Sequence, residues 1–507
     1  MDLTASLAPA LDPRPLAGAP ESRPLDWLLT TEPARLARRH LALVGGFAAL
    51  AALAAFAIQL EWLTHALDAF EARTFGAILS LHGTLAMYFV GLPLFLGVLG
   101  HSLLLEQLGL KRVTHARLAR ASWHLMLAGG VVVAAGFVTG GTEAGWMFDS
   151  DLGAGFALPG CRTAAIGVWI ATLGISALCI SQAGTIVGWW RRAPADTIVP
   201  EMAWAFLWTA LSGLVASAIL VWATSVVILD SSLGMHLFDA AAGGDPQVFA
   251  DLFRLVVSSC QSMVLISALG TVFGVLRGAG LPRGRHQPRA RGSLGVAAAI
   301  SLLGVTGVFT WAGPTATVSP ELGALSAEAV MGAVALASFT VVIVELIRAL
   351  ARGASPVDPA RLAAIAAIPT AALALLVAVP SILPATRIVV SRTVLATTQL
   401  HIICFALPAL AFLAGALRVW RGPASRRADA ITRVAIGVVA VGLAATFGPL
   451  LVTGVAGQSF RANSYPDELQ VLHVLSFAGT TILLAGLGVA ALVLTRNLLQ
   501  SQTAREL

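Results

Sequence analysis

Two histidines lie inside long apolar segments, where an ionisable side chain is costly to bury unless it is used. His82 lies in the segment 76–103 and His401 lies in the segment 393–417. Neutral imidazole is a common ligand of haem iron in proteins. Two histidines at one depth on different helices could hold one haem between them. The spacing alone leaves two interpretations open, a pair of packing histidines or a pair of haem ligands.

The composition fixes the kind of element that must carry these histidines. The chain has 507 residues, of which 57% are hydrophobic and 11% are charged, and its mean hydropathy is +0.84. This excludes a water-soluble protein of ordinary composition. Apolar runs of about 20 residues can cross a bilayer core of about 30 Å. We therefore expect an all-α integral membrane protein with twelve transmembrane helices, at roughly 39–60, 76–103, 122–140, 163–189, 202–229, 252–276, 294–312, 325–347, 362–383, 393–417, 434–455 and 470–494.

The distribution of positive charge predicts the orientation. Most of the 32 Lys and Arg residues fall in the two tails and the even-numbered loops, and only six lie on or near the other face, namely Arg73, Arg162, Arg254, Arg387, Arg392 and Arg461. The positive-inside rule then places both termini in the cytoplasm. We expect the membrane to be a bacterial inner membrane. We expect a disordered tail over 1–38, one membrane domain over 39–495 and a short tail over 496–507. The first 25 residues lack the apolar core of a signal peptide, and the basic loops explain the pI near 9.9 without nucleic acid as a partner.

The two histidines share a depth below the periplasmic face. His82 is about six residues into its span and His401 about eight, which corresponds to roughly 9 Å and 12 Å. The other histidines are expected at or near the cytoplasmic face (His40, His101, His115, His124 and His286) or in periplasmic loops (His65 and His236), all solvated or interfacial. His473, at the start of the last span, is a weak candidate for a contact with a haem edge. The four cysteines are scattered and indicate neither a disulfide framework nor a zinc site.

Several segments resemble subunit I of the haem–copper oxidases, from about residue 40 to 495. Residues 79–130 resemble the family's second and third spans, and they contain the His-Gly-Thr sequence that begins at His82. The Gly-Gly-Asp-Pro sequence at 243–246, the AGWMF sequence at 144–148 and the YPDE sequence at 465–468 resemble periplasmic motifs of the family. The resemblance implies a twelve-helix bundle like that of subunit I.

The resemblance also implies roles for single residues. His82 and His401 match the two ligands of the low-spin haem, and Arg461 matches one of the two arginines that pair with the haem propionates. The ligands of the oxygen site are absent, because Gln399 stands for the high-spin haem ligand, and Ser258, Gly313 and Pro314 stand for the copper ligands. Ser262 replaces the tyrosine of that site. The proton routes lose their acidic residues too, since Cys260 stands in the place of one and Arg112, with a reversed charge, in the place of another.

These matches predict a degenerate subunit that binds one low-spin haem and no copper, and that relays electrons or acts as a scaffold within a respiratory or redox complex. The haem is expected to be of b type, because Gln59 stands where a-type members have an arginine. The expected partners are other oxidase or redox subunits in the membrane, with a periplasmic cytochrome or copper domain, or quinol, as the electron donor. Three alternatives stay open: an active terminal oxidase (cytochrome c or quinol oxidase) or nitric oxide reductase, a haem-free structural or assembly subunit, and a secondary transporter.

Overall fold

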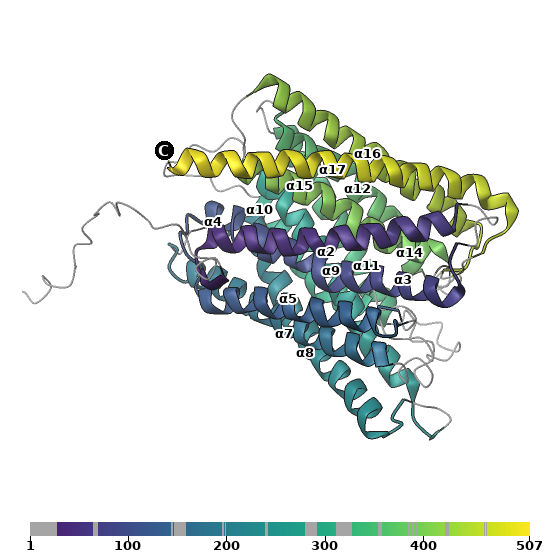
Figure 1. Cartoon of the computed structure of the whole chain (residues 1–507). Helices are drawn as coiled ribbons and strands as arrows, with labels where there is room; N and C mark the ends of the chain where they lie inside the picture. The colour runs from purple at the N-terminus through teal and green to yellow at the C-terminus, as the bar shows by residue number, and fades with distance from the viewer. Residues whose placement is uncertain are drawn as a thin grey trace, which may run out of the picture.

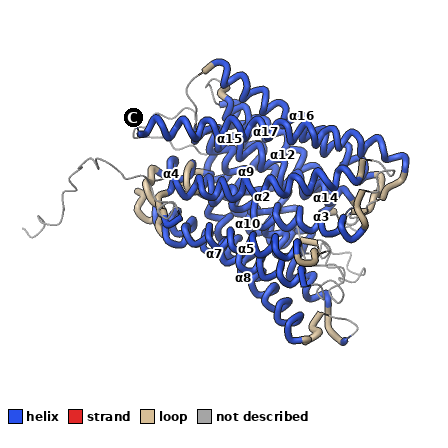
Figure 2. The backbone as a smooth tube through the Cα atoms, viewed as in Figure 1, coloured by secondary structure: helices blue, strands red, loops and turns tan. Residues whose placement is uncertain are grey.

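The structure is a computed structural model of the whole chain. It describes residues 28–63, 69–142, 145–146, 159–194, 197, 199–238, 242–278, 292–310, 327–352, 357–383, 386, 390, 393–420, 425–460, 462 and 464–506. Within these residues the backbone is almost entirely helical (Figure 2). The one β-bridge there joins Thr393 and Ser459.

The helices of the bundle correspond to the expected spans in order. The two histidine-bearing spans are composite: α3 (Ala72–Thr84) continues into the π-helices η1 (Leu85–Gly91) and η2 (Pro93–Leu99), and α14 (Val394–His401) continues into η4 (Ile402–Ala406) and α15 (Leu407–Val419). The remaining spans are α2 (Pro33–Glu61), α5 (Ala116–Val138), α7 (Pro159–Trp190), α8 (Glu201–Leu233), α9 (Pro246–Gly278), α10 (Gly292–Thr310), α11 (Ala327–Arg352), α12 (Pro359–Ile382), α16 (Arg426–Val455) and α17 (Gln470–Glu506). Two short elements, α4 (Leu103–Leu108) and η5 (Asp467–Leu469), lie in connections.

Length and composition mark these helices as membrane spans. Within the described ranges, eleven helices are long and apolar enough to cross a membrane, and a shorter apolar helix, Leu294–Thr306, lies within α10. The chain is therefore a multi-pass membrane protein. The outer helices extend beyond the expected boundaries: α2 begins at Pro33, since proline is favoured in a first helical turn, and α17 reaches Glu506, since neither Gly nor Pro interrupts it after Gly488.

The helices run roughly along one common direction (Figure 1). Helices α16 and α17 lie on one side of α2 and the group α5, α7 and α8 lies on the other in this view. Helix α2 begins at the end of the bundle where α17 ends. We call the end where α3 and α14 begin the proximal end, and the end where α2 begins the distal end.

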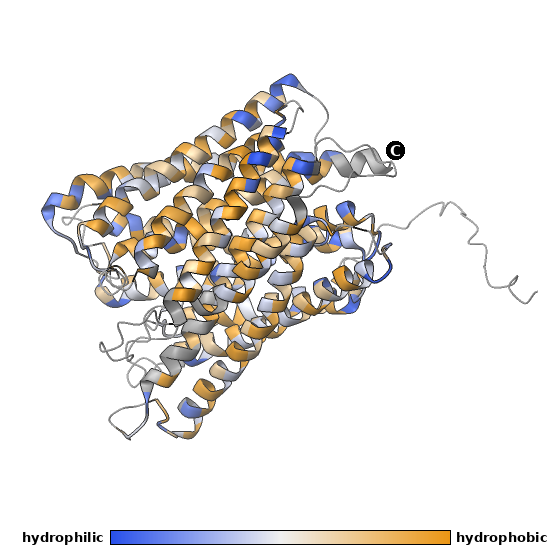
Figure 3. Ribbon diagram, turned by 180° about the vertical axis from the view of Figure 1, so that it is seen from behind, coloured by the Kyte–Doolittle hydropathy of each residue, from blue (hydrophilic) through white to orange (hydrophobic). Residues whose placement is uncertain are grey.

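Apolar residues occur along most of the length of the helices, including those on the outside of the bundle (Figure 3). Helices α16 and α17 expose residues such as Val441, Val455 and Leu492, which are 60%, 76% and 72% exposed. Exposed apolar residues along the whole length of a helix suit a lipid environment rather than water.

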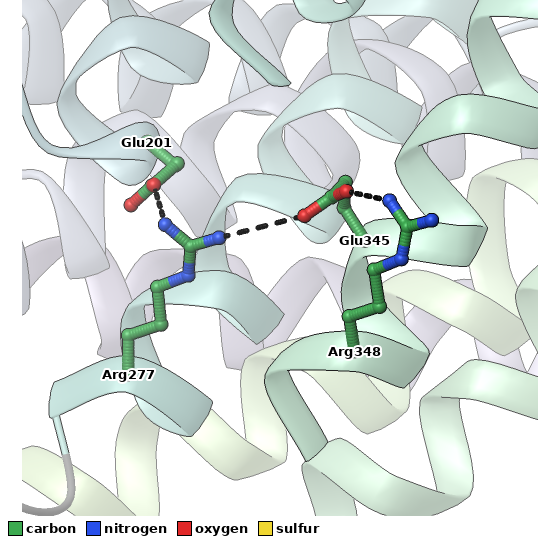
Figure 4. A network of polar contacts seen from close by, with 4 residues as sticks. All are labelled: Glu201, Arg277, Glu345 and Arg348. Atoms are coloured by element: carbon green, nitrogen blue, oxygen red, sulfur yellow. Dashed lines mark hydrogen bonds and ion pairs between the residues drawn. The ribbon is translucent and has the colours of Figure 1, made fainter. Parts of the chain in front are cut away.

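A network of charged residues ties three helices together at the distal end (Figure 4). Arg277 of α9 pairs with Glu201 of α8 and lies 4.0 Å from a carboxylate oxygen of Glu345 of α11. Arg348 pairs with the other oxygen of Glu345. The four charges cancel, so the two carboxylates can stay largely buried.

Helices α16 and α17 pack with their backbones in close contact. A Cβ atom on Gly479 would lie 2.3 Å from the backbone carbon of Ala445. Gly488 lies further along the same helix, and a Cβ atom there would meet nothing within 4 Å. Of these two glycines, Gly479 is the one at which the packing requires the absence of a side chain.

This difference predicts opposite effects of two matched substitutions. Gly479→Ala should destabilise the protein by roughly 1–3 kcal/mol, because the new methyl group forces the helices apart. Gly488→Ala should be neutral or stabilising by up to about 1 kcal/mol, because alanine is the better helix former. Thermal unfolding in detergent measures both effects. Equal unfolding temperatures for the two variants would contradict the packing of α16 against α17.

Candidate functional site

His82 and His401 face each other across the interface between α3 and α14. Their Nε2 atoms are 3.3 Å apart, although the residues are 319 positions apart in the chain. The ring centroids are 5.6 Å apart and the ring planes differ by 6°. The structure thus brings together the two histidines that the sequence singled out.

Backbone carbonyl groups fix the hydrogens on both rings. His82 Nδ1–H donates to the carbonyl oxygen of Ala51 in α2 at 2.9 Å, and His401 Nδ1–H donates to the carbonyl oxygen of Thr397 at 2.7 Å. A carbonyl oxygen can only accept, so each Nδ1 must carry a hydrogen. In a neutral imidazole the Nε2 atom then carries a lone pair. Two lone pairs therefore point at each other inside an apolar bundle.

This arrangement fits a metal ion held between two imidazoles. Opposed lone pairs repel each other unless an electron-poor centre lies between them. Imidazole–metal bonds are about 2 Å long, so an ion on the line between the Nε2 atoms needs a further separation of only about 0.7 Å. Metal-bound histidines usually donate their other ring N–H to a carbonyl or carboxylate group, as both do here. Two imidazole nitrogens are also the donor atoms that the two axial positions of a haem iron accept.

Both histidine-bearing helices change from α to π geometry just after the histidine. The π-helix η4 begins directly after His401, and η1 begins three residues after His82. Pro93 and Pro408 follow on these two helices, and proline cannot donate to the carbonyl four residues earlier. Wider π turns inside α-helices are common at functional sites, and here they mark the helices of the histidine pair.

The loop at 145–146 packs on α3 beside His82. A Cβ atom on Gly83 would lie 2.5 Å from the ring of Trp146. Gly145 N–H donates to Ser80 Oγ at 2.9 Å, and the Tyr88 hydroxyl donates to the carbonyl oxygen of Trp146 at 3.0 Å. Gly83, which directly follows the histidine, therefore makes room for the indole. Phe447 of α16 packs against the ring of His401, with centroids 5.8 Å apart.

The other predicted site residues are placed only in part. Gln399 is buried, and its side-chain oxygen accepts from the hydroxyl of Ser381. Ser262 is also buried, and its hydroxyl has no hydrogen-bond partner among the described residues. Gly313, Pro314 and Arg461 lie outside the described residues, as does the side chain of Ser258.

The expectation that His40 and His101 are solvated or interfacial is wrong. They are 0% and 2% exposed, and their rings stack with centroids 5.4 Å apart. Each donates Nδ1–H to the carbonyl four residues earlier, and the Nε2 atoms lie near Ser122 and Gln182. These hydrogen bonds offset the free-energy cost of removing the two imidazoles from water. The partners lie on other helices, so the position of each histidine along its own helix could not predict them.

A polar cluster lies at the proximal end, and of its members the sequence had singled out His473 and, as the first residue of the YPDE motif, Tyr465. Its members are Trp62, Gln458, Tyr465 and His473, which come from the ends of α2, α16 and α17. His473 packs on Tyr465 and Trp62 with ring centroids 4.0 Å and 5.6 Å apart, and its Nε2–H donates to Gln458 Oε1 at 2.8 Å. Burial and the neighbouring Asp467 raise the pKa of Tyr465, so its hydroxyl stays protonated and donates to the carbonyl oxygen of Trp62.

Comparison with known proteins gives a family for this bundle. Residues 35–482 match the family described as cytochrome c and quinol oxidase polypeptide I. The chain belongs to this family.

Curated relatives carry the same family's names. A probable cytochrome c oxidase subunit 1-beta of Nocardia farcinica is 30% identical over 249 residues, which are 46% of this chain and 41% of the relative. A cytochrome c oxidase subunit 1 of Corynebacterium efficiens is 30% identical over 226 residues, which are 43% of this chain and 38% of the relative. One from Thermostichus vulcanus is 25% identical over 239 residues, 46% of this chain and 41% of the relative. The aligned part thus spans about two fifths of these relatives' length.

Proposed function

We propose that this polypeptide I family member holds one low-spin haem between His82 and His401 and passes single electrons within a respiratory complex, without reducing oxygen itself. The observation that carries the proposal is the opposed pair of Nε2 atoms, 3.3 Å apart, with both Nδ1–H groups bonded to carbonyls. A haem with both axial positions occupied supplies one-electron transfer and offers no position for oxygen.

The residues around the pair have separate tasks in this proposal. The carbonyl groups of Ala51 and Thr397 orient the two imidazoles, and the apolar bundle around them excludes water. Gln59, in place of an arginine, favours a b-type haem over an a-type haem, and its side-chain oxygen is already held by the Ser476 hydroxyl at 3.3 Å. Arg461 is the proposed partner of a haem propionate.

Copper is not part of the proposed site. Glycine and proline have no side-chain ligand atoms, so Gly313 and Pro314 cannot bind it, and the serine at 258 offers only a hydroxyl group. The amide of Gln399 is an unusual ligand for haem iron, and its oxygen is engaged by Ser381. The runner-up function is an active terminal oxidase, which the names of the curated relatives favour. A haem-free structural subunit is the third candidate.

The proposed orientation places the proximal end at the periplasmic face of a bacterial inner membrane, with both termini in the cytoplasm. The distribution of arginines supports this assignment. The start of α2 and the end of α17 lie at the same end of the bundle (Figure 1), which agrees with this orientation. A haem near the periplasmic face is within reach of a periplasmic cytochrome or copper domain, or of quinol, as electron donor.

Loss of either histidine should remove the low-spin haem. His82→Ala and His401→Ala should each reduce the sharp α-band of the reduced protein by roughly tenfold or more, because one axial bond is lost. His124→Ala, at the distal end, should leave the band unchanged. Optical spectra of the purified, reduced proteins measure this effect.

Replacing one histidine with another iron ligand distinguishes a role in binding iron from a role in packing. His401→Met should keep a six-coordinate haem and raise its midpoint potential, because methionine–histidine ligation favours the reduced iron. An α-band that both alanine variants retain unchanged would rule out the assignment and favour a haem-free structural role or a haem held elsewhere.

The purified protein should contain no stoichiometric copper and should not reduce oxygen. The expected copper content by elemental analysis is near zero per chain, and oxygen uptake with reduced cytochrome or quinol should stay at background, because the copper ligand positions hold Ser258, Gly313 and Pro314. One copper per chain, or steady turnover of oxygen, would instead establish the active terminal oxidase.

A single buried haem needs a donor and an acceptor, so the chain should be part of a complex. Purification in mild detergent should bring down at least one further redox subunit, and the haem should be reduced faster in membranes with respiratory substrate than without it. A stable chain on its own, with equal reduction rates under both conditions, would contradict the relay and indicate a structural or sensory haem.

A further inference from the structure

Gln458 carries a buried amide group whose nitrogen has no hydrogen-bond partner among the described residues. The side chain is 5% exposed. Its oxygen accepts from His473 Nε2–H at 2.8 Å, so the nitrogen faces the other way with both hydrogens unused. Buried donors without an acceptor are rare in native proteins and indicate a function or a missing water or ligand.

The position of Gln458 connects it to both histidine-bearing helices. Its backbone oxygen accepts from Val394 N–H, the first residue of α14, at 2.9 Å. Its partner His473 packs on Trp62, which packs on Phe75 of α3 with ring centroids 6.4 Å apart. Val394 and Phe75 each lie seven residues before the histidine of their helix, which is about 10 Å along the axis. Gln458 therefore lies at the proximal end, about two helical turns from the histidine pair.

Its neighbours in the cluster have already used their donors. Trp62 Nε1–H donates to the carbonyl oxygen of Ala462 at 2.9 Å, and the Tyr465 hydroxyl donates to the carbonyl oxygen of Trp62 at 2.7 Å. In this cluster, the side-chain N–H groups of Gln458 are therefore the donors that remain free to bind an acceptor. A carboxylate is the strongest such acceptor, because hydrogen bonds to an ionised group are shorter and stronger than neutral ones.

We propose that Gln458, held in place by His473, donates an amide hydrogen to a carboxylate of the haem bound between His82 and His401. The inference rests on the proposed function, since the haem is the group that brings carboxylates to this part of the bundle. Gln458 is thus a positioning and charge-stabilising residue for the cofactor.

The proposal predicts a specific effect on the redox behaviour of the haem. A hydrogen-bond donor stabilises the ionised carboxylate and lowers its affinity for a proton. The anion in turn stabilises the oxidised iron, so protonation of the carboxylate raises the midpoint potential as the pH falls. Removal of the donor should move this pH-dependent step to higher pH, with about a tenfold gain in proton affinity.

The test is a spectroelectrochemical titration of the haem in the purified protein over a range of pH values on both sides of neutrality. Gln458→Met keeps the length of the side chain and removes the donor. Gln182→Met is the matched control, because Gln182 is 0% exposed and also has an unpartnered atom, its oxygen, but lies at the distal end. The Gln458 variant should retain the α-band and show the shifted pH step, whereas the Gln182 variant should follow the wild type.

A second variant guards against a folding defect. Gln458→Glu is nearly isosteric and places a like charge beside the carboxylate, so it should shift the pH step in the same direction and further. Titration curves of both Gln458 variants that coincide with the wild type would overturn the proposal and leave a water molecule as the partner of the amide. Wild-type protein without haem would overturn the proposed function itself, and with it this inference, so the two failures are distinguishable.

Discussion

The candidate site depends on one electrostatic constraint, two imidazole lone pairs that point at each other in an apolar interior. Each ring is fixed by a bond from Nδ1–H to a carbonyl oxygen, of Ala51 for His82 and of Thr397 for His401. Without an electron-poor centre between the Nε2 atoms, this geometry has a cost and no compensation. With an iron ion there, the same geometry is a rigid, pre-oriented ligand pair. The pair is thus hard to explain as packing alone.

Several features of the surrounding helices lie next to that pair. The π-helical segments after both histidines, the missing side chain at Gly83 beside Trp146 and the phenyl ring of Phe447 all lie within the contact range of the two rings or next to them in the chain. At the distal end, the charged network around Arg277 joins α8, α9 and α11 far from the histidines (Figure 4). Membership in the polypeptide I family accounts for the bundle, whereas the chemistry depends on which ligands this chain retains.

The sequence was a good guide to the bundle and to the proximity of His82 and His401, and a poor one to the other polar contacts. Twelve apolar runs predicted the spans because a run long enough to cross a bilayer has few other structures available. His82 and His401 stood out because burial of an isolated imidazole is costly. His40 and His101 were assigned to the surface because their partners, Ser122 and Gln182, come from helices that no local pattern connects to them. The amide of Gln458 was missed for the same reason, and the π turns left no recognisable pattern in the sequence.

The central claim is that both imidazoles bind one iron, and electron paramagnetic resonance of the oxidised protein tests it most directly. Ring planes that differ by only 6° split the two iron d orbitals that interact with the imidazoles, so the account predicts one low-spin haem per chain with a rhombic spectrum of three well-separated g values. A high-spin signal, a signal from copper, or the single large g value typical of perpendicular imidazole planes would contradict it.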